Sequence, residues 1–248
     1  MLSAVESISV QPAHVVLRSY GDGKTLFKRA LPFEKPDDTP HLLTNRADFL
    51  KVLYEEAVRL GVRFHFGSTV SKIDFIKPAI EFSGGANVAC DVIFGADGQK
   101  SFCRELFLGH SDPPQFSGDL AYRITIPVSE VETHPDLASL LENHDISCWM
   151  GPGAHVVCYQ LKNALNVVLV APDNPSPSSS DNNSPNASLQ ELEDVFHNWD
   201  PRLRKLFKLT KGVLKHRLLS SHEMPTWSHP NGTFALVGDA CHVSTPHL

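Results

Sequence analysis

Two segments of the chain combine an apolar run with a neighbouring glycine and aspartate. They are residues 92–98, which end in Asp97 and Gly98, and residues 234–240, which contain Gly238 and Asp239. After a strand, glycine lets the backbone approach a ligand closely, and aspartate can accept hydrogen bonds from sugar or sugar-alcohol hydroxyls. Each turn alone is common loop chemistry, so a single occurrence says little about function.

The residues that follow each turn make the patterns more specific. Asp97 begins a D-G-x-x-S-x-x-R pattern that ends at Arg104, and Gly238 begins a G-D-A-x-H pattern. Upstream, Arg46 stands in the first turn of an expected helix. Its charge there adds to the helix dipole in attracting a pyrophosphate. Together these residues indicate a nucleotide-type ligand.

These motifs, in this order, resemble the single-component FAD-dependent aromatic-ring monooxygenases. The closest likeness is to the para-hydroxybenzoate and salicylate hydroxylase type, in its fungal secondary-metabolism branch. Segments 118–123 and 149–155 also look like that branch, and the resemblance runs from about residue 43 to residue 246. It implies an enzyme that hydroxylates an aromatic or polyketide-type small molecule, with FAD as cofactor and NAD(P)H and dioxygen as co-substrates.

The resemblance also implies roles for individual residues. Those implied in cofactor binding are Arg46, Asp97, Gly98, Arg104, Gly238 and Asp239. Arg123 and Tyr159 are implied as catalytic residues on a substrate sheet that faces the flavin. Arg123 would stabilise a phenolate, and Tyr159 would orient the substrate hydroxyl or relay a proton. A structural ion pair for Arg123 and simple packing for Tyr159 are the alternatives.

Composition excludes several other functions. The 22 basic and 28 acidic residues give a net charge of −6, which is unsuited to gripping a nucleic-acid backbone. No apolar run is long enough for a transmembrane helix, and the first residues do not resemble a signal peptide, so we expect a cytoplasmic protein. The 5 scattered cysteines and 13 histidines form no metal-binding pattern, so no metal site is expected.

Hydrophobic periodicity places these residues on expected elements. A helix should begin after Asn45, a good N-cap, and end at Gly61. A capping box at Ser188 and Glu191 predicts a second helix, and a third should include residues 203–207. A short helix is expected at 101–108, and strands at 15–17, 62–66, 70–75, 79–82, 91–94, 121–126, 147–150, 156–159, 166–170 and 233–237.

The expected architecture is α/β, with a partial FAD/NAD(P)-binding Rossmann-like domain and a mostly antiparallel β-sheet substrate domain. Residues 1–112 are assigned to the partial cofactor domain, and residues 113–224 to the substrate domain with a disordered loop at 172–188. Residues 225–248 return to the cofactor domain with the G-D motif.

A complete family member carries a G-x-G-x-x-G unit that binds the adenosine diphosphate half of FAD, and this sequence contains none. We therefore expect a chain that is incomplete at both ends relative to the family, with an apolar face exposed. Two alternatives to the monooxygenase stay open. One is a truncated, non-catalytic remnant that serves as an interaction module, and the other is a related flavin epoxidase.

Overall fold

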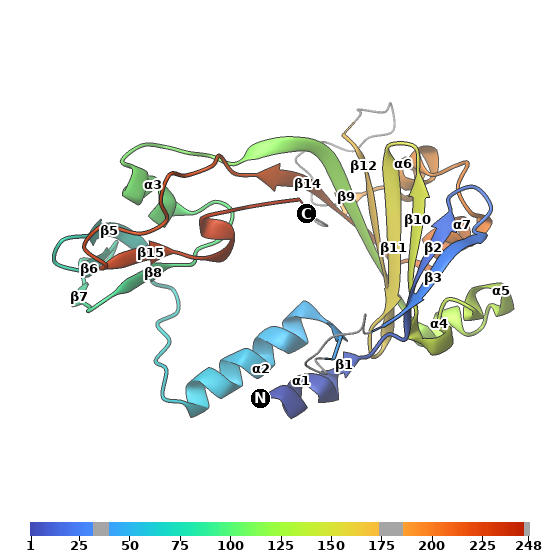
Figure 1. The fold of residues 1–248 in the computed structure, drawn as a ribbon, viewed down its shortest axis with the longest axis horizontal. Coiled ribbons are helices and arrows are strands. Elements are labelled where there is room, and N and C mark those ends of the chain that lie inside the picture. The colour runs from blue at the N-terminus through green and yellow to red at the C-terminus, as the bar shows by residue number, and fades with distance from the viewer. Residues whose placement is uncertain (32–39, 174–185, 246–248) are drawn as a thin grey trace. The chain divides into compact units, whose positions relative to one another are not determined.

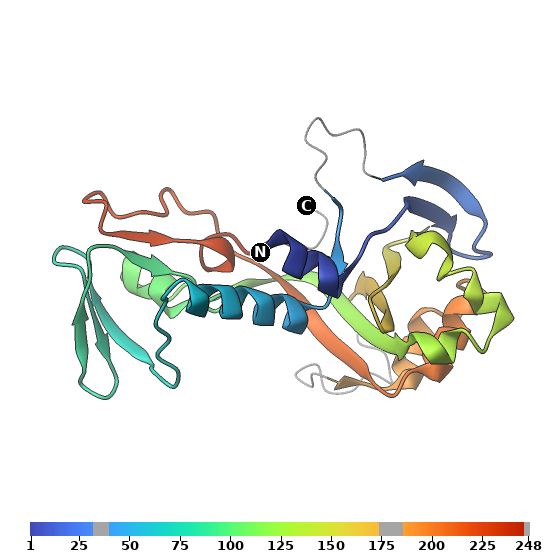
Figure 2. The ribbon, with the colours of Figure 1, turned by 90° about the horizontal axis from the view of Figure 1, so that it is seen from below.

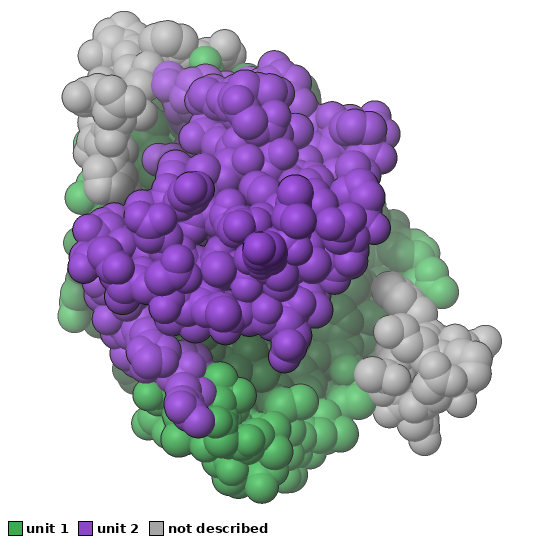
Figure 3. All heavy atoms as spheres, turned by 90° about the vertical axis from the view of Figure 1, so that its left-hand side faces the viewer, with its two compact units in different colours: residues 1–62, 119–216 green, residues 63–118, 217–248 purple. Residues whose placement is uncertain are grey.

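The computed structural model describes residues 1–31, 40–173 and 186–245. The chain divides into two compact units, which Figure 3 colours separately. Unit 1 comprises Met1–Val62 and Asp119–His216, and unit 2 comprises Arg63–Gly118 and Arg217–Leu248. Among the described residues, no helix is both long and apolar enough to cross a membrane.

Unit 1 is built on a large mixed sheet with the strand order β13-β14-β9-β12-β11-β10-β2-β3 (Figure 1). β2 adds to β10 in parallel, whereas β9, β12, β11 and β10 pair antiparallel in succession. The strands are β2 (His14–Ser19), β3 (Thr25–Ala30), β9 (Gln115–Pro127), β10 (Ile146–Gly151), β11 (Ala154–Gln160), β12 (Ala164–Pro172), β13 (Asn186–Ala187) and β14 (Val213–Ser220). Residues 115–118 of β9 and 217–220 of β14 are counted with unit 2.

Short helices cover one face of this sheet: α4 (Val128–Val131), α5 (Pro135–Ala138), α6 (Leu189–Val195) and α7 (Pro201–Leu209), with a 3-10 turn, η1, at Glu142–His144 (Figure 1). Successive side chains of a strand point to opposite faces of the sheet, so every second residue faces the helices. On β9, Tyr122 and Ile124 are buried against the helices, whereas Arg123 and Thr125 between and beyond them are exposed. The core of unit 1 therefore lies between one sheet face and the helices.

The rest of unit 1 consists of α1 (Leu2–Ile8), the short paired strands β1 (Ser9–Val10) and β4 (Leu43–Thr44), and α2 (Arg46–Arg59); α1 and α2 are in contact (Figure 2). The predicted helix after Asn45 is confirmed. The Asn45 side chain accepts a hydrogen bond from the backbone N–H of Ala47 at 2.8 Å, and Gly61 follows the helix with φ of 87°. No residue of α2 is buried, so its apolar stripe is exposed within the described chain.

Unit 2 contains an antiparallel meander of β5 (Val70–Asp74), β6 (Ala79–Phe82) and β7 (Asn87–Ala89), visible in Figure 2. It also contains a parallel pair, β8 (Ile93–Gly95) with β15 (Phe234–Leu236), the helix α3 (Phe102–Leu108) and the 3-10 turn η2 (Gly238–Ala240). Its core joins Ile93, Cys103 and Phe234 to rings such as Phe75, whose centroid lies 4.9 Å from that of Phe234.

The structure differs from the sequence-based expectations in several places. The predicted strand at 62–66 is wrong. Apolar and polar residues alternate in this segment, but it pairs with no strand in the described chain. The first 30 residues contribute β2 and β3 to the large sheet, whereas the expected boundary grouped them with residues up to 112. β14 was not expected, and most of the predicted loop at 172–188 lies outside the described residues.

Candidate functional site

The two glycine–aspartate turns lie at the same end of one strand pair. β8 and β15 run parallel, with Leu236 opposite Gly95, and the backbone N–H of Val237 donates to the Gly95 carbonyl at 3.0 Å. Asp97 follows Gly95 by two residues, and Asp239 follows Leu236 by three. Because the carboxyl ends of parallel strands meet at one edge, the two turns leave the sheet side by side. Both motifs therefore follow the same end of the β8–β15 pair within unit 2.

Glycine is required in both turns by the backbone. Gly98 has φ of 83° and Gly238 has φ of 60°, which is the left-handed region that most side chains avoid. A Cβ at either position would have no heavy atom within 4 Å. The space beside both glycines is thus open, which leaves room for a ligand to approach the backbone.

The two aspartates differ in what they bind within the chain. The Asp97 carboxylate accepts from the Ser101 hydroxyl at 2.5 Å and from the Cys103 backbone N–H at 2.9 Å, at the start of α3. Burial raises the pKa of Asp97, but these hydrogen bonds outweigh it and leave the pKa below its usual value. Asp239 is exposed, and no described residue hydrogen-bonds to its carboxylate. Asp97 therefore orders its turn, while Asp239 has acceptor capacity to spare.

Arg104 connects α3, which follows the first turn, to the segment that follows the second turn. Its side chain is buried, and its Nε donates to Asp112 Oδ2 at 2.6 Å. Its two terminal nitrogens donate to the carbonyls of Cys241 at 2.8 Å and His222 at 2.7 Å. His222 Nδ1 in turn lies 2.9 Å from Asp112 Oδ1. Arg104 thus links α3 to the segment just after Asp239, and all of its partners here come from the protein.

Sequence reasoning did not identify Asp112 and His222. Neither belongs to a motif, and His222 is 118 residues away from Arg104 in the chain. The one available signal was a charged helix residue at the end of the D-G pattern, which needs a buried counter-ion if it points into the core. That signal indicates that a partner exists without saying which residue it is.

Arg123 and Tyr159 lie on the same face of the large sheet in unit 1. Arg123 pairs with Val168 of β12, and Tyr159 pairs with Asn166 two residues along that strand, so both side chains point away from the covering helices. Burial raises the pKa of Tyr159, and the positive charge of Arg123 only partly opposes this. The phenol therefore stays protonated at neutral pH and can donate a hydrogen bond.

The surroundings of Arg123 test the alternative that this arginine forms a structural ion pair. Arg123 is exposed, and no carboxylate among the described residues forms an ion pair with it. Within residues 1–31, 40–173 and 186–245, a structural ion pair therefore does not account for this arginine. Its guanidinium is available to an anionic oxygen on a ligand.

Arg46 is the exposed first residue of α2, directly after the Asn45 cap. It belongs to unit 1, whereas Asp97, Gly98, Arg104, Gly238 and Asp239 belong to unit 2. The five residues of unit 2 therefore lie on or next to the two turns. Arg123 and Tyr159 share one face of the large sheet, and Arg46 lies on a separate helix of unit 1.

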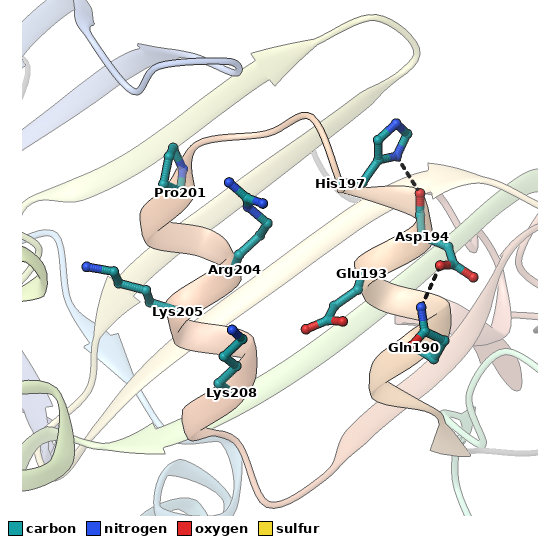
Figure 4. A pocket seen from close by; sticks show the side chains of 8 residues that line it. All are labelled: Gln190, Glu193, Asp194, His197, Pro201, Arg204, Lys205 and Lys208. Carbon is teal, nitrogen blue, oxygen red and sulfur yellow. Dashed lines mark hydrogen bonds between the residues drawn. The ribbon is translucent and has the colours of Figure 1, made fainter.

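A pocket of about 520 Å³ lies elsewhere in unit 1, between α6 and α7 (Figure 4). It is lined by charged groups of both signs: Glu193 of α6 points toward α7, which carries Arg204 and Lys208, whereas the Asp194 carboxylate accepts a hydrogen bond from Gln190 at 2.8 Å. None of the candidate residues lines it, and Lys205 at its rim is held by Asp136. Among the described residues, no cluster of three or more histidine, cysteine, aspartate or glutamate side chains could hold a metal ion.

Comparison with known proteins identifies relatives along the whole chain, although no family model matches it. The chain is 32% identical to the FAD-dependent monooxygenase OpS4 of Beauveria bassiana, over 100% of this chain and 59% of that protein. It is 30% identical to the salicylate hydroxylase asL1 of Sarocladium schorii, over 82% of this chain and 43% of that protein. The chain thus spans about half of the length of these curated relatives.

Solved structures agree on the fold. A salicylate hydroxylase in complex with its substrate matches 98% of this chain and 62% of its own, with a TM-score of 0.77 and 23% identity. CtdE, solved with FAD and a substrate, matches 99% of this chain and 61% of its own, with a TM-score of 0.83 and 18% identity. At these identities the likeness establishes the fold alone.

Proposed function

The chain belongs to the FAD-dependent monooxygenases, and on that basis we propose that it works as part of a monooxygenase of the salicylate hydroxylase type. The reaction is hydroxylation of an aromatic or polyketide-type small molecule, with FAD, NAD(P)H and dioxygen, in secondary metabolism. The observation that carries the proposal is the placement of two glycine–aspartate turns at one end of the parallel pair β8–β15. In α/β proteins, ligands bind beyond the carboxyl ends of such strands.

The residues of this edge fit FAD. Bound FAD supplies the activation of dioxygen after reduction by NAD(P)H. Asp239, exposed and with acceptor capacity to spare, accepts hydrogen bonds from the sugar-alcohol chain. Gly98 and Gly238 leave space beside the backbone, and Asp97 and Arg104 keep the two turns in register. Arg46 contributes positive charge at the start of α2 for the phosphate or ribose region.

The substrate lies against the sheet face that carries Arg123 and Tyr159. Arg123 stabilises the negative charge of a phenolate oxygen, which makes the ring electron-rich. The Tyr159 hydroxyl, protonated at neutral pH, orients the substrate hydroxyl and holds a proton at its Oη. The role of the protein here is to position the ring and to exclude water.

A second candidate function is a non-catalytic module of the same family. Its support is the exposed apolar stripe of α2. In this reading the chain offers that stripe to another polypeptide and does not hold FAD. For either function we propose a reducing, cytoplasmic location, which the 5 free cysteines support.

A titration of the purified chain with FAD distinguishes the two functions. The monooxygenase proposal expects saturable binding, seen as a shift in flavin absorbance and quenching of its fluorescence. Asp239→Ala should weaken that binding about 10- to 100-fold, the value of one or two charge-assisted hydrogen bonds. Asp91→Ala is the matched control, since Asp91 is also an exposed carboxylate of unit 2.

The outcomes separate cleanly. Loss of affinity in Asp239→Ala alone supports the cofactor edge. An equal loss of FAD affinity in both variants would mean that the loss comes from the change in net charge and not from a contact of Asp239. If the chain binds no FAD even with the cofactor in excess, independent monooxygenase activity is excluded and the non-catalytic module is favoured.

A further inference from the structure

A single row of directly paired residues crosses six strands of the large sheet. Arg123 is opposite Val168, Val168 is opposite Val157, and each later partner follows in the same way. From β9 to β3 the row reads Arg123, Val168, Val157, Cys148, Leu17 and Phe27. Directly paired residues point to the same face of a sheet, so these side chains form one line across it.

This row lies on the face opposite to the helices of unit 1. Its neighbours along the strands, such as Ile124 on β9 and Trp149 on β10, point the other way and are buried in the helix-covered core. In the row itself, Arg123 is exposed, the residues Val168, Val157, Cys148 and Leu17 are half-buried, and Phe27 is 51% exposed. Strands are spaced about 4.8 Å apart, so the row is roughly 24 Å long.

The chemistry of the row is strongly asymmetric. One end carries a guanidinium, which binds carboxylates and phenolates through paired hydrogen bonds. The next four side chains carry no charge and no strong hydrogen-bonding group. Tyr159 stands two residues beyond Val157 on β11, close to the charged end. A ligand that matches this surface has an acidic oxygen at one end and an apolar body that extends away from it.

We propose that the substrate is an acidic or phenolic ring with an apolar extension, which lies across the strands with its acidic oxygen at Arg123 and its extension over Val168 and Val157. This inference rests on the proposed function, since it assumes that this sheet face holds the substrate. It goes further by assigning the direction in which the ligand lies and the side chains that select it. Salicylate itself would contact only the Arg123 end of the row.

A homologous series of ligands tests the extension. Salicylate, 4-propylsalicylate and 4-hexylsalicylate place an alkyl chain directly opposite the carboxylate, and their affinity for the purified chain can be measured by titration calorimetry. A fully buried methylene strengthens binding about fourfold, and a chain lying on an open face buries about half of its surface, so about twofold per methylene is expected. Propylsalicylate should then bind about eightfold, and hexylsalicylate about sixtyfold, more tightly than salicylate.

Two variants separate the ends of the row. Val157→Thr keeps the shape of the side chain but adds a hydroxyl, so it should reduce the gain along the series while leaving salicylate affinity within about twofold. Arg123→Gln should weaken all three ligands by about the same factor, tenfold or more. Val88→Thr is the matched control, because Val88 is a 48% exposed strand valine of unit 2, and it should change nothing.

The proposal fails if affinity does not rise along the series, if no member binds, or if Val157→Thr and Val88→Thr behave alike. A flat series with normal salicylate binding and normal FAD binding would overturn only the apolar extension. Loss of FAD binding with an intact alkyl series would overturn the proposed function while leaving the ligand-binding row in place.

Discussion

Replacing Arg104 with methionine should destabilise unit 2 selectively. The Arg104 side chain is 5% exposed and that of Asp112 is 12% exposed, so the change removes the arginine partner of a largely buried carboxylate and leaves it the contact with His222. The carbonyls of Cys241 and His222 lose their donors as well. Removing one member of a buried ion pair costs about 3–5 kcal/mol. At about 1.4 kcal/mol per tenfold, local opening becomes about 100- to several thousand-fold more frequent.

Hydrogen exchange measured by mass spectrometry can assign this effect to its unit. Peptides from 93–112 and 217–245 should exchange faster by roughly two to three orders of magnitude in Arg104→Met, whereas peptides from β11 and β12 should be unchanged. Arg59→Met is the control, because the Arg59–Glu56 pair lies at the surface, where water screens it and it contributes little to stability. Equal exchange rates in the two variants would refute the view that Arg104 holds the turns together.

Two further substitutions test the packing and the electrostatics. A Cβ at Gly95 would lie 2.8 Å from Leu236 and 2.9 Å from Cys103, so Gly95→Ala should destabilise unit 2 by about 1–3 kcal/mol, and an unchanged urea midpoint would contradict this close approach. Burial raises the pKa of Asp200, but hydrogen bonds from Arg202 and Trp149 outweigh it and leave the pKa below its usual value. Asp200 therefore stabilises unit 1 above about pH 4, and this stability is lost as the pH falls through its lowered pKa. The free energy of unfolding by urea, measured between pH 2 and 6, should fall less steeply with decreasing pH in Asp200→Asn than in the unchanged chain. Equal slopes would contradict this role of Asp200.

Local sequence signals predicted the elements that depend on neighbouring residues. The Asn45 cap set the start of α2, and the Ser188 side chain accepts from the backbone N–H of Glu191 as the capping box requires. The glycine–aspartate patterns likewise indicate the turns at Gly98 and Gly238, both of which have positive φ. These features are set within a few residues of chain, so a single sequence contains them.

Features that depend on distant partners were not predictable in the same way. The parallel addition of β2 to β10 joins residues about 130 apart, and its register follows from the whole sheet. Lys215 is 3% exposed, and its Nζ lies 2.6 Å from Glu191 Oε1, a partner on another element that no local pattern indicates. At 62–66 the sequence predicted a strand that the structure lacks. Alternation of apolar and polar residues predicts a strand, but it does not provide a neighbouring strand to pair with.

The most direct test of the central claim is a map of backbone amide signals of the isotope-labelled chain during a titration with FAD. If the turns after β8 and β15 form one cofactor-binding edge, signals from residues 96–101 and 237–242 should shift together and saturate at the same concentration. If FAD binds but shifts only one of the two segments, or neither, the shared edge does not exist and the account is contradicted.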